Sequence, residues 1–480
     1  MSHPLPIVAE DFKHRAAAAA TNLRIAEIFD RSARGKDDLR RLAMPELPHP
    51  LDTRELAARI KNHTLQNLDR YLDQFASRVR DHGGHVHFAA DGTQANQIIT
   101  EIAQAASAGL IVKSKSMVSE EIELNHALQA AGLNVLETDL GEYILQLAGE
   151  KPSHIVTPMA HKPKEEVGQL FAAKLGIPYT DDPTALTKAA RKVLRESFRA
   201  ADMGIIGANF AVAETGTVVI VTNEGNGRFC SSRPRLLVCL MGMEKLVPQL
   251  KHVPIYLKLL AKSATGQRIT CYTSMITGPK RAGDFDGPEE FHVVILDNGR
   301  SHVLAGEYRD ALRCIRCGAC LNACPIYRKI GGHAYDATYP GPIGSVISPL
   351  FTSLATYADL PSACSLCGAC LEACPVRIDL PTQLIHLRSD VNKDGHSPLS
   401  WRLGFKGWKL GMSSGLLYRL GATFGRWFMK IGARDGWKHK LPATGGIWTR
   451  YRDVPVMPKP FHKRWADLQK ELDEEGKDER

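Results

Sequence analysis

Two cysteine-rich segments constrain this chain more than any other feature of its sequence. The spacing C-x2-C-x2-C-x3-C-P occurs at residues 314–325 and again at residues 364–375. The pentapeptide Cys-Gly-Ala-Cys-Leu is repeated inside both segments, at 317–321 and 367–371. The eight cysteines of this repeat are Cys314, Cys317, Cys320, Cys324, Cys364, Cys367, Cys370 and Cys374.

This spacing is typical of chains that hold two [4Fe–4S] clusters through cysteine thiolates, as bacterial two-cluster ferredoxins do. In such runs the cysteine before the proline ligates the other cluster. We therefore expect Cys314, Cys317, Cys320 and Cys374 to hold one cluster, and Cys364, Cys367, Cys370 and Cys324 to hold the second. Zinc knuckles would show pairs of cysteines rather than groups of four, and disulfides are disfavoured in a cytosolic chain.

The 39 residues between the motifs are more than small ferredoxins have. The spacing resembles the helical ferredoxin modules in the iron–sulfur subunits of succinate dehydrogenase, fumarate reductase and glycolate oxidase. That resemblance implies a relay inside a complex. Purely structural clusters are the alternative, and electron transfer is favoured because crossed ligation brings two clusters close together.

The rest of the composition is that of an ordinary globular protein, with 44% hydrophobic and 24% charged residues. We find neither a signal peptide nor a run of about 18 apolar residues, so we predict that the chain stays in the cytosol. The three remaining cysteines, Cys230, Cys239 and Cys271, are expected to be buried small hydrophobes.

The positive charge is concentrated at the C-terminal end. Residues 401–480 contain 17 Lys and Arg against 9 Asp and Glu, whereas residues 1–400 are nearly balanced at 44 against 43. All six tryptophans also lie beyond residue 400. We therefore predict a separate basic, Trp- and Gly-rich region over 396–480.

The sequence before the cysteines alternates between short strand-like and helical segments. After a long helix expected over 53–82, with Asp52 as its cap, strands are predicted at 85–90, 110–115 and 134–138, separated by helices at 93–108 and 119–131. This alternation predicts an open, mostly parallel α/β sheet domain over 51–300, preceded by a helical extension over 1–50. Closely spaced strands at 210–213 and 217–222 indicate that part of the sheet is antiparallel. A helical ferredoxin-like domain is expected over 301–395.

Three loops of the α/β domain could contact a ligand, because ligands bind at strand ends in such sheets. One follows a strand and contains Lys113, Ser114 and Lys115. The second is a turn with Glu214 and Thr215, and the third is a glycine-rich turn with Asn223, Glu224 and Asn226. On the residues alone, simple hairpin and crossover turns are the favoured interpretation.

The combination of motifs resembles the lactate utilisation protein B family. The resemblance rests on Ala-Glu-Thr-Gly-Thr at 213–217 and Asn-Glu-Gly-Asn at 223–226, ahead of the two cysteine motifs and the Trp-rich tail. It implies a sheet fold similar to sugar-phosphate isomerases and coenzyme A transferases. It also implies an iron–sulfur electron-transfer subunit that works with two other lactate-utilisation subunits in oxidising L-lactate to pyruvate. It assigns neither a catalytic residue nor a terminal electron acceptor.

Other functions stay open at this point. One alternative is a self-sufficient α/β enzyme or redox sensor whose clusters are structural, and another is an electron-transfer subunit for a different 2-hydroxy acid such as glycolate. For the basic tail we favour a protein partner, with peripheral contact to a membrane surface as the alternative. No nucleic-acid partner is expected, because no binding motif accompanies the charge.

Overall fold

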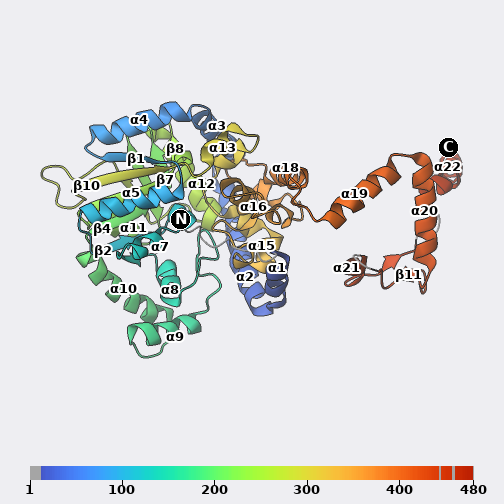
Figure 1. Ribbon diagram of the computed structural model, residues 1–480, viewed down its shortest axis with the longest axis horizontal. Helices are drawn as coiled ribbons and strands as arrows, with labels where there is room; N and C mark the ends of the chain where they lie inside the picture. The colour runs from blue at the N-terminus through green and yellow to red at the C-terminus, as the bar shows by residue number, and fades with distance from the viewer. Residues whose placement is uncertain (1–11, 443–444, 457–459, 479–480) are drawn as a thin grey trace. The chain divides into compact units, whose positions relative to one another are not determined.

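A computed structural model describes residues 12–442, 445–456 and 460–478 of the chain (Figure 1). The chain divides into two compact units, one ending at Asp394 and one beginning at Gly395. Each unit is described by itself. The domain boundaries expected near residues 50 and 300 stay predictions.

A six-stranded parallel sheet lies at the centre of the first unit (Figure 1). Its strands, in spatial order, are β1 (His85–Ala89), β10 (Glu290–Leu296), β7 (Leu236–Gly242), β4 (Met203–Gly207), β2 (Leu110–Lys113) and β3 (Asn134–Glu137). Every residue of β7 is buried, as expected of a central strand that is covered on both faces. The prediction of a mostly parallel α/β domain is therefore confirmed.

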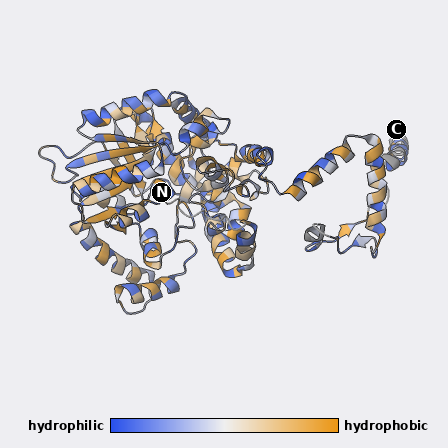
Figure 2. Ribbon diagram, viewed as in Figure 1, coloured by the Kyte–Doolittle hydropathy of each residue, from blue (hydrophilic) through white to orange (hydrophobic). Residues whose placement is uncertain are grey.

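Successive side chains of each strand point to opposite faces of the sheet and pack into two different cores. Val294 packs with Ile99 of α5 (Gly92–Ala105) and Leu128 of α7 (Leu124–Ala130) on one face. Val293 belongs to the core on the opposite face, together with Phe75 of α4 (Leu68–Asp81). Figure 2 shows the hydrophobic residues concentrated along the strands.

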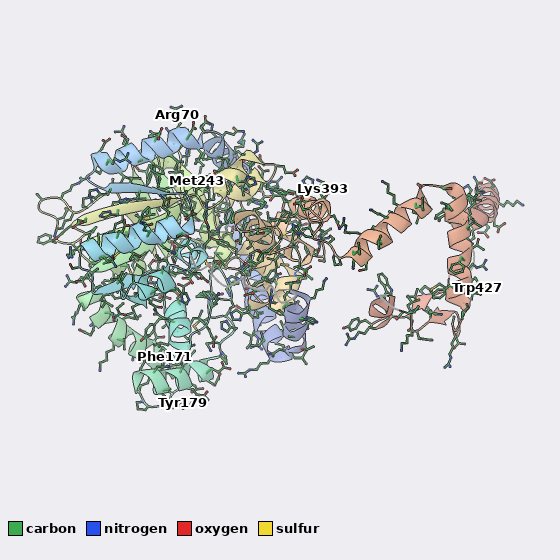
Figure 3. The ribbon with its side chains drawn as sticks, viewed as in Figure 1. Arg70, Phe171, Tyr179, Met243, Lys393 and Trp427 are labelled. Atoms are coloured by element: carbon green, nitrogen blue, oxygen red, sulfur yellow. The ribbon has the colours of Figure 1, made fainter. Side chains whose placement is uncertain are left out.

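Three helices form a smaller third core beside the sheet. They are α8 (Leu140–Ala148), α9 (Lys164–Leu175) and α10 (Pro183–Ala200). Phe171 of α9, labelled in Figure 3, is fully buried and packs edge-on against Tyr143 of α8, with ring centroids 6.3 Å apart. This layer holds α8 against the end of β3.

The antiparallel strands form a sheet of their own rather than part of the main sheet. Its order is β8 (Leu246–Val247), β5 (Phe210–Val212), β6 (Thr217–Thr222) and β9 (Tyr272–Ile276). Strand β6 pairs antiparallel with both β5 and β9, whereas β5 and β8 are parallel. Short connections make such local pairing easy, because antiparallel strands need only a hairpin turn.

Two details differ from the sequence-based expectations. The long helix expected over 53–82 is divided into α3 (Pro50–Gln66) and α4, because the side chain of Asn67 donates to the His63 carbonyl at 2.8 Å and interrupts the helix. Asp52 lies inside the first turn of α3, and His49 occupies the cap position. Cys271 is exposed rather than buried, while Cys230 and Cys239 are buried as expected.

The cysteine motifs lie in a helical region built from short elements. These are α13 (Arg300–Ala305), η4 (Arg309–Arg313), α14 (Ala319–Ala323), α15 (Pro325–Ile330), α16 (Gly341–Phe351), α17 (Ala369–Ala373) and α18 (Leu380–Lys393). The N-terminal helix α2 (Leu23–Ala43) packs against α14 and α15. Phe29 meets the Tyr327 ring edge-on, and Arg328 forms an ion pair with Asp37 at 3.1 Å.

The second unit contains helices and one small pair of strands. Its elements are α19 (Leu399–Met412), α20 (Gly415–Lys430), β11 (Trp437–Lys438), α21 (Gly445–Thr449), β12 (Val454–Pro455) and α22 (Phe461–Asp478). Neither α19 nor α20 buries a side chain, and Trp427 of α20 (Figure 3) is 58% exposed. Among the described residues, no helix is long and apolar enough to cross a membrane.

Candidate functional site

The two cysteine motifs fold into the same loop. The second residue after the first cysteine has a positive φ in both, 58° at Arg316 and 56° at Leu366. Its backbone N–H donates to the sulfur of that first cysteine, at 3.4 Å in the first motif and 3.2 Å in the second. Gly318 and Gly368 follow the second cysteine at φ of 75° and 83°, where a side chain would be strained. The sequence repeat is thus also a structural repeat.

Three cysteines of the first motif share an enclosed cavity with one cysteine of the second. The four are Cys314, Cys317, Cys320 and Cys374. The cavity is small, about 20 Å³, and Ile155, Ile343 and Val376 are among the apolar residues that line it. Several thiols in a dry pocket are the donor set that iron–sulfur clusters require. These four cysteines therefore fit a [4Fe–4S] cluster.

The other four cysteines also lie near one another. Burial first, and then the neighbouring Cys364 and Cys367, raise the pKa of Cys324 to about 11. The same causes, with Cys364 and Cys324 as neighbours, raise the pKa of Cys370 to about 12. Cys367 is exposed and Cys364 half-buried, so this second group lies closer to solvent than the first. It supplies four thiols of the same chemistry.

Arginines from outside the motifs hold the cysteine loops in place. Arg54 of α3 donates to the Cys374 carbonyl at 2.7 and 3.1 Å and to the Glu372 carbonyl at 2.7 Å. Arg388 of α18 donates to the Cys364 carbonyl at 2.7 Å. Short helices leave many backbone carbonyls without a hydrogen-bond donor at their ends and in the loops between them. The arginine side chains supply donors to these carbonyls.

A buried charged network joins the α/β domain to the first cysteine group. Arg300 forms ion pairs with Glu244 at 2.7 Å and with Glu121 at 2.8 Å. The Arg316 guanidinium lies 4.4 Å from the centre of the Tyr339 ring and 3.5 Å from Glu244. Sequence reasoning missed this network, because its members are far apart along the chain and follow no motif.

Two buried lysines add positive charge near the first group. The Lys61 ammonium donates to the Glu244 carbonyl. Burial lowers the pKa of Lys61 to about 7 and that of Lys245 to about 8, while the Glu244 carboxylate and Cys314 oppose the shift at both. Positive charge beside a cluster favours its reduced form, which carries one more negative charge.

Five of the eight ligand contacts predicted for the α/β domain gather around the carboxyl end of β2. They are Lys113, Ser114, Lys115, Glu224 and Asn226. Glu224 lies close enough to Asp139 and Lys115 for their charges to interact. Gly227, next to Asn226, lies against the Ser114 side chain, with room there for little more than a methyl group.

The other three predicted contacts serve other parts of the structure: Glu214, Thr215 and Asn223. Glu214 accepts a hydrogen bond from the Leu250 N–H at 3.0 Å and lines a separate surface groove. Asn223 accepts from the Cys271 N–H at 3.2 Å and thereby closes the loop before β9. The eight residues therefore do not form one site.

Carboxylates that sequence reasoning missed complete the group at β2. The Lys113 ammonium contacts Ser119 at 2.8 Å, Glu120 at 3.0 Å and Glu137 at 2.8 Å, which uses all its donors. Glu142 of α8 brings a third carboxyl group, and oxygens of the three glutamates lie within 4.8 Å of one another. Glu137 could have been found, because it ends β3 directly beside Lys113, which ends β2.

The loop around His154 contacts the first cysteine motif. His154 donates through Nε2 to the Asn322 side chain at 3.1 Å, while its Nδ1 accepts from the Val156 N–H at 2.9 Å. Burial lowers the pKa of His154 to about 3, so the ring is neutral. A Cβ at Gly318 would come within 3.4 Å of the ring, so the loop lies directly against the first cysteine group.

The fold and these sites define a class of iron–sulfur protein in which an α/β domain precedes a helical cluster domain. Family models match in that order: the LUD domain at residues 72–296, the 4Fe-4S dicluster domain at 310–378, and the lactate utilisation protein B C-terminal region at 387–471.

Relatives match along nearly the whole chain. Lactate utilization protein B from Geobacillus thermodenitrificans is 47% identical, over 89% of this chain and 90% of that protein. The protein of the same name from Bacillus subtilis is 46% identical, over 91% of both chains. The chain therefore belongs to the lactate utilisation protein B family.

Two further proteins were matched. The Escherichia coli K12 protein named "Uncharacterized electron transport protein YkgF" is 46% identical, over 89% of this chain and 90% of that protein. A solved structure of a DUF162 family protein from Deinococcus radiodurans is 15% identical, with a TM-score of 0.28, and covers 48% of this chain and 98% of that one. No inference about the fold follows from a score of that size.

Proposed function

We propose that this chain is the iron–sulfur electron-transfer subunit of an assembly that oxidises L-lactate to pyruvate and so allows growth on lactate. The observation that carries the proposal is the cavity shared by Cys314, Cys317, Cys320 and Cys374, with the second group of cysteines beside it. The names of the relatives support both halves of the proposal, lactate utilisation in one case and electron transport in another.

This arrangement supports two [4Fe–4S] clusters with crossed ligation. Cys374 would complete the first cluster and Cys324 the second, as the spacing rule predicts. When bound, the clusters supply one-electron carriers. Burial of Cys370 close to Cys320 keeps the two groups adjacent, and the exposure of Cys367 gives the second group access to an acceptor.

The protein's own residues would tune the potential of the inner cluster. Arg316, Lys61 and Lys245 lie near Cys314, so positive charge surrounds the inner group. The outer group has no comparable set of buried cations among the described residues. These cations would favour the reduced form of the inner cluster, which suits it to receive electrons from a donor. Its exposed Cys367 makes the second group the side from which a partner could take electrons.

Two other lactate-utilisation proteins are the proposed partners. The basic helices α19 and α20 expose their apolar side chains, and aromatic and arginine residues are typical anchors at protein interfaces. We propose that this region binds a partner subunit.

Growth of a deletion strain tests the proposed function. Deletion of the gene should stop growth on L-lactate and leave growth on pyruvate normal, because the block lies before pyruvate. Complementation with the wild-type gene should restore growth, whereas Cys317→Ser should not. Normal growth of the deletion strain on L-lactate, with no second lactate dehydrogenase in the cell, would disprove the lactate assignment.

A further inference from the structure

The carboxyl ends of β2 and β3 hold buried polar groups that the fold leaves without partners. Lys113 is not one of them, since its three donors are all taken within the protein. The Lys115 ammonium, however, is buried and has no hydrogen-bond partner among the described residues. The same holds for both carboxyl oxygens of Glu142 and for Oε2 of Glu137.

Unpartnered buried polar atoms are rare, and each one needs an explanation. Glu142 is 3% exposed and Glu137 is likewise buried, so bulk water does not satisfy their oxygens. Lys115 and Glu142 lie close enough for their charges to interact, yet no hydrogen bond joins them. A ligand placed between the two would satisfy both.

The charges at this place favour a ligand that carries a carboxylate and a hydroxyl group. Three glutamates alone would suit a metal ion, but the Lys113 ammonium already contacts both Glu120 and Glu137 and offsets one of their charges. The Lys115 ammonium has no acceptor among the described residues, and a carboxylate of a ligand would supply one. Burial raises the pKa of Glu142 well above its usual range, and Glu137 adds to this rise, so Glu142 is a neutral acid able to donate a hydrogen bond.

One neighbour of the group reaches the surface of the protein. Glu224 is exposed, and its carboxylate accepts from the Leu140 N–H at 3.4 Å, at the start of α8. Lys115 interacts with the Glu224 carboxylate as well as with Glu142. Glu224 therefore marks the side from which a small molecule would reach Lys115.

One short loop connects this place with the first cysteine group. Pro158 lies against Gly141, the residue before Glu142, where a Cβ would come within 2.9 Å of the proline ring. Three residues earlier in the same loop, Ile155 lines the cavity of the first cysteine group. A molecule held by Glu142 would therefore be separated from that cavity by a single loop.

We propose that Lys115 and Glu142 bind a small 2-hydroxy acid at the ends of β2 and β3, with Lys115 contacting the carboxylate and Glu142 the hydroxyl group. This inference rests on the proposed function, because it places the substrate class of that function beside the inner cluster. Lys113 acts as a positioning residue that holds Glu137 and Glu120 around the same place.

Calorimetry with the full-length, cluster-loaded protein under anaerobic conditions tests the inference. L-lactate and propionate, which lacks the hydroxyl group, are the two probes. We expect L-lactate to bind more tightly to the wild type than propionate does. Lys115→Met should weaken the binding of both probes at least tenfold. Glu142→Leu should weaken the binding of L-lactate about tenfold and leave the binding of propionate unchanged.

Matched controls come from an exposed ion pair nearby, Lys151 and Glu123, which lie 3.6 Å apart. Lys151→Met and Glu123→Leu should bind both probes as the wild type does. Iron content and dithionite reduction, measured on every variant, show whether the fold and the clusters are intact. Lys115→Met removes a buried polar group without adding volume, and Glu142→Leu adds only a little, so each provides an independent test if the other fails to fold.

Three results would overturn the inference. The first is a wild-type protein that binds neither probe, and the second is unchanged L-lactate affinity in both variants. The third is Mn²⁺ binding that is lost in Glu142→Leu while L-lactate does not bind, which would make the group a cation site. If the clusters form and growth on L-lactate still depends on the gene, the proposed function survives any of these results. A protein without clusters would instead contradict the proposed function itself.

Discussion

Glu142 belongs to the proposed ligand site, although no sequence motif indicates it. It follows Asp139, the cap of α8, and the sequence around it resembles any helix start. The cysteine ligands, in contrast, could be predicted from spacing alone, because cluster geometry fixes the number of residues between ligands. Lys61, Arg300 and Glu244 could not be predicted, since only the folded chain brings them together.

Replacement of Glu142 by Gln should make the protein more stable, increasingly so as the pH rises. The raised pKa keeps Glu142 protonated in the folded protein, whereas the unfolded chain releases the proton above about pH 4.3. The folded state thus binds the extra proton, and wild-type stability falls as the pH rises toward the raised pKa. From pH 6 to pH 8, the free energy of unfolding of Glu142→Gln should exceed that of the wild type by a margin that grows by up to about 1.4 kcal/mol per pH unit.

The measurement is the melting temperature of both cluster-loaded proteins across this range. Glu289→Gln is the control, because the surface Lys280 lowers the pKa of Glu289 and leaves it ionised in both states throughout. The difference in melting temperature between Glu289→Gln and the wild type should stay constant across the range. A constant difference for Glu142→Gln as well would show that this carboxyl group is not buried as a neutral acid.

Pairs of cysteine substitutions test the crossed ligation. The wild type should contain about eight iron atoms per chain, and Cys374→Ser about four. Adding Cys317→Ser to Cys374→Ser should remove no more iron, because both residues would ligate the same cluster. Adding Cys367→Ser instead should remove the second cluster as well.

The measurement is iron and acid-labile sulfide per chain, with electron paramagnetic resonance to follow the cluster that remains. Cys271→Ser, at a cysteine outside the motifs, is the control and should keep both clusters. The opposite pattern, in which Cys317→Ser and not Cys367→Ser removes the second cluster, would mean that each motif ligates its own cluster.

At the scale of elements, periodicity predicted β1, β2 and β3 of the main sheet, but it missed β4, and the helix expected over 119–131 is divided into α6 (Met117–Glu121) and α7. It failed where one side chain decides the local structure, as at Asn67, where α3 ends and α4 begins. It also failed to place β5 and β6 in a separate sheet, because pairing partners far along the chain, such as β9, leave no local pattern. The same limit explains why the sequence does not indicate that Glu214 and Asn223 lie apart from the group at β2.

Helices α19 and α20 bury none of their side chains, so packing within the chain stabilises them little. Residues 399–430 contain six Lys and Arg and no Asp or Glu, and the apolar side chains of both helices are exposed. Six glycines at 404, 407, 411, 415, 421 and 425 weaken them further, by about 0.8–1 kcal/mol each relative to Ala inside a helix. We therefore expect these helices to be stabilised by a partner.

Truncation after Pro398 should leave both clusters assembled but release the partner proteins. The measurement is co-purification with an N-terminally tagged chain, together with its iron content. A second truncation after Pro460 removes only α22 and should keep the partners. Retention of the partners by the shorter chain, combined with loss of sedimentation with anionic vesicles, would show that the helices bind a membrane surface instead.

At the scale of the whole molecule, three regions of different chemistry follow one another along the chain. The LUD domain carries the buried polar group at β2 and β3, the cysteine domain carries two groups of four thiols, and the C-terminal region presents an exposed basic surface. The order matches a path in which electrons enter near the α/β domain and leave through the more exposed cysteines.

Reduction of the clusters by L-lactate tests this path most directly. The tagged chain, purified anaerobically with its partners from lactate-grown cells, receives L-lactate while cluster reduction is followed by electron paramagnetic resonance and pyruvate is measured. The account predicts that pyruvate appears together with reduced clusters, and that Cys317→Ser abolishes both. Pyruvate formation at the wild-type rate while the clusters stay oxidised, or in the Cys317→Ser assembly, would contradict it.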